Sequence, residues 1–156
     1  MDKERVVAIL GFYRTLDDEI RLKTDEKREI EEQYYSSVSG IQMDGMPKGK
    51  GGTSSPTETT ALNVPKWASE DLRLLEKECA ALQRVKGAIR KELNRLPYIQ
   101  RVVVLDFYIR GYQWVRISAQ VHYSERQCKN IRDDALAKLA KRFDANRTIS
   151  AYSFPQ

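Results

Sequence analysis

The sequence predicts an all-α protein: an antiparallel helical hairpin of the coiled-coil type, followed by a compact helical C-terminal part. Two long segments repeat apolar residues at spacings of three and four, which is the period of a helix with one apolar stripe. A stretch rich in Gly, Ser, Thr and Pro separates them. The 41% hydrophobic and 31% charged residues are typical of a charge-rich helical protein with a core of its own.

The first helix is predicted from residue 2 to about residue 35, and the second ends near residue 96. The stripe of the first is Val6, Ile9, Tyr13, Leu16, Ile20, Lys23, Lys27, Ile30 and Tyr34. The stripe of the second is Ala68, Leu72, Leu75, Cys79, Leu82, Lys86, Ile89, Leu93 and Leu96. Two such stripes can cover each other, so residues 1–96 are expected to form the hairpin. The three lysines are expected to lay their stems along the seam with their amines in water, or else to set register or oligomeric state.

The intervening segment, residues 36–65, is predicted to be a long loop. Its stretch GMPKGKGGT suggests a phosphate-binding loop, but the glycine spacing is one residue short and Gly51, not Ser or Thr, follows Lys50. No strand is predicted before it. The stretch therefore does not predict a nucleotide site, and Lys48 and Lys50 are kept as a possible contact with a partner.

The C-terminal part, residues 97–147, contains the signals of a helix-turn-helix. A helix from Pro97 is expected to close at Gly111, and a short helix is expected over residues 113–120. Ser124 and Gln127 form a capping box that starts a longer helix. The side chains expected to face inward are Ile117, Val121, Tyr123, Cys128 and Ile131. Residues 148–156 are read as a tail.

Two residues fit the requirements of the predicted turn. Ser118 is a small residue where the two helix axes would cross closely. His122 occupies the place where glycine would be easiest, and histidine tolerates a positive φ better than most residues.

The polar face of the longer helix has the residue types that read base edges in a DNA major groove. The candidates for reading bases are Glu125, Arg126, Gln127, Lys129 and Asn130. The candidates for binding the DNA backbone are Tyr112, Trp114, Arg116, Lys138, Lys141 and Arg142. Residues 97–156 carry 10 basic and 5 acidic groups, so this end is expected to face a polyanion.

These residues resemble region 4 of the sigma-70 family, the promoter-binding module of bacterial initiation factors. The matching runs are Tyr108-Ile109-Arg110-Gly111, Val115-Arg116-Ile117-Ser118, Tyr123-Ser124-Glu125-Arg126 and Ala135-Leu136-Ala137-Lys138-Leu139. His122 and Ser118 depart from the usual glycine and alanine. The whole chain is similar to phage and prophage regulators of the RinA and ArpU type, including Gly45-Met46-Pro47-Lys48-Gly49 and Ser55-Pro56-Thr57.

The resemblance implies a late-gene transcriptional activator that binds double-stranded promoter DNA and acts with the RNA polymerase of a bacterial host, in whose cytoplasm it is expected. A homodimer through the hairpin is possible. The protein is expected not to be an enzyme and to have no cofactor. No metal site is expected, because one histidine and two separated cysteines cannot supply the usual zinc ligands. No membrane segment is expected, because no apolar run approaches about 18 residues. Two alternatives stay open: a DNA-packaging protein of the small-terminase kind, and a polymerase-binding adaptor with little affinity for DNA.

Overall fold

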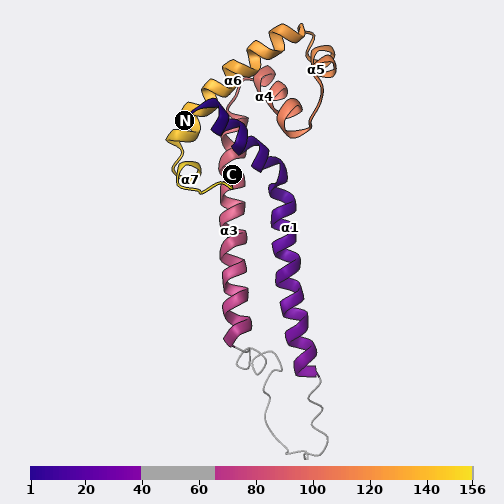
Figure 1. Ribbon diagram of the computed structural model, residues 1–156, viewed down its shortest axis with the longest axis vertical. Coiled ribbons are helices and arrows are strands. Elements are labelled where there is room, and N and C mark those ends of the chain that lie inside the picture. The colour runs from indigo at the N-terminus through magenta and orange to yellow at the C-terminus, as the bar shows by residue number, and fades with distance from the viewer. Residues whose placement is uncertain (40–65, 156) are drawn as a thin grey trace, which may run out of the picture. The chain divides into compact units, whose positions relative to one another are not determined.

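The computed structural model describes residues 1–39 and 66–155 and is all-helical over these ranges (Figure 1). The all-α prediction is confirmed. The two long helices are α1, Lys3–Ser39, and α3, Lys66–Asn94. They are followed by α4 (Tyr98–Val104), the π-helix η1 (Leu105–Ile109), α5 (Trp114–Val121), α6 (Glu125–Ala145) and α7 (Arg147–Ser150). None of the described helices is long and apolar enough to cross a membrane.

The chain divides into two compact units, and each long helix contributes to both. Unit 1 comprises Met1–Ile20 and Ala81–Gln156, and unit 2 comprises Arg21–Ala80. This division differs from the predicted one, which separated residues 1–96 from residues 97–147. Its physical reason is a core shared between the ends of the long helices and the C-terminal helices.

The main core of unit 1 collects apolar side chains from five helices. Val6 and Ile9 of α1 lie in one cluster with Ile89 of α3 and with Leu139 and Phe143 of α6, and all five are fully buried. Burial of large side chains on this scale is worth about 1.5–3 kcal/mol for each of them. The start of α1 and the end of α3 are therefore part of the body that holds α6.

The residues after 147, read from the sequence as a tail, also belong to this core. Ile149 of α7 is fully buried, and the Phe12 ring contacts those of Tyr152 and Phe154, with centroids 5.8 and 5.4 Å apart. The Asn146 side chain caps α7 by accepting hydrogen bonds from the backbone of Thr148 and Ile149. Short apolar segments of this kind have no period that a sequence pattern could detect.

A polar contact joins the end of α3 to the end of α6 within unit 1. The Glu92 side chain is buried, and it accepts hydrogen bonds from Asn146 (3.0 Å) and Arg95 (3.2 Å). Arg142 donates to the Glu92 backbone carbonyl at 3.5 Å, which satisfies an acceptor at the C-terminal end of α3. Because these partners compensate its burial, Glu92 fixes the position of α6 instead of weakening the core.

Unit 2 is held by a thinner core and by ion pairs. Among its described apolar residues only Tyr34, Ala68 and Leu75 are buried. Lys23 pairs with Glu78, and Lys27 donates to Glu76 at 2.8 Å, so that a later residue of α1 meets an earlier residue of α3. The two helices of this unit therefore run antiparallel. In unit 1 the third seam lysine, Lys86, pairs with Asp17. All three lysines are half-buried, and each amine meets a carboxylate on the facing helix.

Candidate nucleic-acid interface

The predicted helix-turn-helix segment consists of α5, three linking residues and α6 (Figure 1). His122 takes the left-handed conformation, with φ 59° and ψ 35°, and is the only described non-glycine residue with a positive φ. Gly111 is also left-handed, with φ 71°. Both conformations agree with the sequence prediction, because histidine and glycine tolerate this region better than bulky residues do.

The turn is fastened by side-chain hydrogen bonds at both of its ends. The Ser118 hydroxyl donates to the backbone carbonyl of Tyr123 at 2.5 Å. The predicted capping box is present: Ser124 Oγ accepts from the Gln127 backbone at 3.2 Å, and Gln127 Oε1 accepts from the Ser124 backbone at 2.9 Å. A capping box of this kind stabilises a helix start by about 1 kcal/mol.

A small second core lies beneath the turn. Val103, Ile117 and Cys128 are fully buried there, with Val121 and Ile131 packed against them. Burial raises the pKa of the Cys128 thiol, and the Glu125 charge adds to the rise. The prediction that Tyr123 also faces inward is wrong, since 40% of this residue is exposed. The contact of Tyr123 with Ser118 is made by its backbone carbonyl, which accepts from the serine hydroxyl, and not by its ring.

The five candidates for reading bases all lie exposed on the first two turns of α6. They differ in what their side chains are free to do. Gln127 Oε1 also accepts from Ser124 Oγ at 3.0 Å, so its oxygen is committed to the capping box and only its amide NH₂ can face a base. A bidentate contact with adenine needs both the oxygen and the NH₂. Arg126 and Asn130, four residues apart on the same face, are free of such a commitment among the described residues.

Beside this face, aromatic rings and cations are stacked together. The Trp114 ring stacks on the Phe107 ring with centroids 4.3 Å apart. The Lys129 ammonium and the Arg132 guanidinium lie 6.0 and 5.4 Å from the centre of the Trp114 ring. The Arg116 guanidinium lies 3.6 Å above the Tyr112 ring. Cation–π contacts of this kind stabilise by about 0.5–2 kcal/mol and hold the cations in place. Phe107 and Arg132 were not predicted, although the spacing of three residues from Lys129 to Arg132 places both on one side of α6.

The remaining backbone candidates are placed differently. Lys138 donates to the Gln100 side chain of α4 at 3.0 Å, and Lys141 is exposed. With Asp134 and Ala137 they line a shallow hollow of about 260 Å³. Arg142 is half-buried, and its bond to the Glu92 carbonyl gives it a structural partner inside unit 1. Of the cations predicted to bind the backbone, Arg116 thus lies over the Tyr112 ring near the start of α5, whereas the other three lie farther along α6.

The segment that leads into α5 was predicted as one helix and instead widens into η1. The Arg110 backbone donates to Leu105 at 2.9 Å, which is the spacing of a π-helix. Asp106 in this turn is fully buried and pairs with Arg110, whereas its second oxygen has no hydrogen-bond partner among the described residues. An apolar period does not distinguish an α-turn from a π-turn, so the sequence could not show this change.

Lys48 and Lys50, the predicted partner-contact residues, lie outside the described residues. Within the described ranges, no group of three or more His, Cys, Asp or Glu side chains is placed to hold a metal ion. Comparisons with protein-family models, with curated proteins and with solved structures found no match. The resemblance to sigma region 4 therefore depends on the residues of this chain alone.

Proposed function

We propose that this protein is a sequence-specific DNA-binding transcriptional activator of phage late genes. The observation that carries the proposal is the surface formed by α5 and α6. Arg126 and Asn130 are exposed on the first two turns of α6, the helix whose Lys129 and Arg132 lie near the Trp114 ring, and Arg116 of α5 lies over the Tyr112 ring. Base-edge donors and acceptors next to fixed cations are the two kinds of contact that sequence-specific binding of a duplex requires.

The charge of unit 1 supports the same proposal. Its residues carry 18 basic and 11 acidic groups, a net charge of +7, although the whole chain carries only +5. Each phosphate contact releases counterions, so the affinity of this unit for DNA should fall steeply as salt rises. In our proposal α6 enters the major groove while Tyr112, Trp114 and Arg116 lie along the backbone.

The resemblance of the whole chain to phage and prophage regulators of the RinA and ArpU type supplies the proposed partner, which is the RNA polymerase of the bacterial host. Lys48 and Lys50 are candidates for that contact, and a homodimer is a further proposed partner. A complete sigma factor also captures single-stranded bases on aromatic and basic residues. We propose that this chain recognises the duplex and recruits polymerase without opening the promoter itself.

The proposal is tested by two arginine replacements on a duplex selected by the protein. Arg126→Ala should cost about 1–3 kcal/mol and abolish preference at one base position. Arg116→Ala should weaken binding to all duplexes alike and lower the slope of log affinity against log salt by about 1. Fluorescence anisotropy against single-base variants of the duplex measures both effects.

Arg90→Ala is the matched control, because it removes the same charge from an exposed arginine of unit 1 that lies on α3. It should change affinity much less than either replacement. If Arg126→Ala weakens binding to selected and random DNA equally, as Arg116→Ala is expected to do, the assignment of α6 as the reading helix is overturned. A ring of eight or more subunits in solution would instead favour a packaging protein.

A further inference from the structure

Unit 2 leaves one side of its helix pair uncovered. Leu22 is 60% exposed, Leu74 56% and Trp67 54%, and these are the large apolar side chains of this unit that lie most open to solvent. Trp67 and Leu74 are seven residues apart on α3 and therefore share one face, about 10 Å apart along the helix. Natural surfaces seldom group large apolar side chains without a partner for them.

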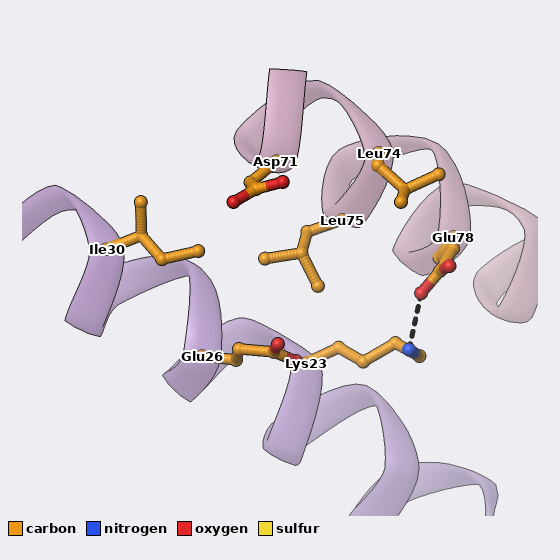
Figure 2. Close-up of a pocket in the computed structure, with 7 residues that line it drawn as sticks. All are labelled: Lys23, Glu26, Ile30, Asp71, Leu74, Leu75 and Glu78. Atoms are coloured by element: carbon orange, nitrogen blue, oxygen red, sulfur yellow. Dashed lines mark hydrogen bonds and ion pairs between the residues drawn. The ribbon is translucent and has the colours of Figure 1, made fainter. Parts of the chain in front are cut away.

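A groove marks the same side of the pair. It has a volume of about 360 Å³ and is lined from α1 by Lys23, Glu26 and Ile30 and from α3 by Asp71, Leu74, Leu75 and Glu78. Figure 2 shows Leu75 pointing toward α1, and Lys23 extending across to Glu78. Leu22 precedes Glu26 by four residues, so it lies on the groove side of α1. The exposed leucines thus border one groove.

We propose that this face binds a second copy of the chain, with α3 packed antiparallel against the α3 of the partner and the two-fold axis at Leu74. The choice rests on charge. On the Leu74 face, Glu70 and Lys77 lie along the edge away from the groove, and Asp71 and Glu78 lie along the groove edge. A two-fold axis makes equivalent residues of the two copies face each other across the same edge.

In this antiparallel arrangement, opposite charges meet along the first edge. Lys77 of one copy lies at the level of Glu70 of the other, and the pair occurs twice. Within the described ranges neither side chain makes an ion pair or a hydrogen bond, and both residues are exposed. On the groove edge Glu78 meets the second copy's Asp71, but Lys23 is already bound to Glu78 and supplies the positive charge between them.

The parallel arrangement of the same faces is disfavoured. It would place Lys77 near Glu78 of the other copy, but Glu78 is already paired with Lys23. It would also place Glu70 against Asp71 of the other copy twice, with no cation at that position. Leu22 is next to Lys23, which is paired with Glu78, so Leu22 lies near the level of Glu78 along α3. In the antiparallel arrangement this level is brought toward Trp67 of the second copy. The three exposed apolar residues would then all be covered. This inference does not depend on the proposed binding of DNA.

Charge reversal at the far edge tests the arrangement. Each of Glu70→Lys and Lys77→Glu should raise the dimer dissociation constant about tenfold, because each replacement sets like charges together twice in the dimer. The double variant Glu70→Lys/Lys77→Glu should restore it, and so should an equimolar mixture of the two single variants. Sedimentation velocity of the full chain measures the constant, and circular dichroism checks that the helices are retained.

Arg90→Glu is the control for Lys77→Glu, because Arg90 is exposed on the part of α3 that belongs to unit 1, outside the helix pair of unit 2 that forms the proposed interface. It should leave the constant within about twofold. A chain that stays monomeric at about 100 µM would overturn the proposal. Tighter association of Glu70→Lys would also overturn it, since this outcome is expected only of the parallel arrangement. A dimer that none of the charge reversals weakens would place the interface elsewhere.

Discussion

Unit 1 and unit 2 both contain parts of the two long helices, but the apolar side chains of these helices are covered more completely in unit 1 than in unit 2. In unit 1 the helix ends are covered by α6, α7 and the residues after them, and five side chains from three helices are fully buried together. In unit 2 the described helices cover only each other, and Leu22, Trp67 and Leu74 stay exposed. An apolar stripe therefore predicts a helix face but not how completely that face will be covered.

The two units also differ in net charge. Unit 1 carries a net charge of +7, while residues 21–80 carry 9 basic and 11 acidic groups, a net charge of −2. A compact basic unit suits a polyanionic ligand, and a thin, slightly acidic helix pair suits association with another protein. The proposed roles, duplex recognition by unit 1 and dimerisation by unit 2, follow this division.

Truncating one buried side chain in each unit should change the free energy of unfolding most. Phe143→Ala should lower the free energy of unfolding by about 3–5 kcal/mol, because Phe143 is fully buried among side chains from several helices. Leu75→Ala should lower the free energy of unfolding by about 2 kcal/mol, the low end for such a change. Leu75 lines the open groove, so neighbouring side chains can move into the space that it leaves. Urea unfolding followed by circular dichroism measures both.

Phe143→Leu serves as the conservative control and should recover most of the loss. A Leu75→Ala variant that loses as much stability as Phe143→Ala would contradict the contrast between a dense core and a thin one.

A second effect should separate the two cysteines. Cys128 of unit 1 is fully buried and burial raises the pKa of its thiol, whereas Cys79 of unit 2 is half-buried. Burial both raises the pKa of the Cys128 thiol and shields its sulfur, so an aromatic disulfide reagent at pH 8 should label the half-buried Cys79 more than about tenfold faster than Cys128. The single-thiol variants Cys128→Ala and Cys79→Ser identify each rate. Equal rates would mean that the core beneath the turn opens as easily as unit 2 does.

The smallest effect concerns the ion pairs of unit 2 at high pH. The hydrogen bond to Glu78 raises the pKa of Lys23, and that to Glu76 raises the pKa of Lys27, from the ordinary value of 10.5. A raised pKa means that the stabilisation is present in full below pH 10.5 and is lost as pH rises through the higher value of the folded state. Because both side chains are partly exposed, the loss should stay below about 1 kcal/mol.

The measurement is the free energy of unfolding between pH 9.5 and 11.5 for the parent chain and for Lys23→Met/Lys27→Met. Both are made in a Cys128→Ala background, since the raised pKa of Cys128 would also lower stability above pH 9. The double variant should show the shallower decline. Identical slopes would show that these pairs do not stabilise unit 2.

The sequence predicts those features that depend on neighbouring residues. The capping box at Ser124 and Gln127, the left-handed His122 and the start of α3 all follow from local chemistry. The exposure of Tyr123, the contacts of Phe12 with residues after 147 and the bond from Arg142 to Glu92 depend on segments far apart in the chain. Those contacts decide which unit a residue joins, and no period of three or four records them.

The candidate site divides in the same way. The exposed positions of Arg126 and Asn130 follow from the period of α6, so the sequence could place them. The commitment of Gln127 to the capping box is visible in the same motif, although it removes a predicted base reader from bidentate use. The stacking of Lys129 and Arg132 on Trp114 needs α5 to cross α6 at one particular place, which the spacing within either helix does not determine.

If α6 reads the base sequence of a duplex, the protein should select its own site from a pool of random duplexes. The full chain is incubated with the pool at about 50 mM salt, where phosphate contacts are strongest, and bound DNA is then recovered at rising salt and sequenced. We expect one enriched motif of a few base pairs, in which Arg126→Ala loses the preference at a single position. Recovery of DNA without any enriched motif, or no retention at 50 mM salt, would contradict this expectation.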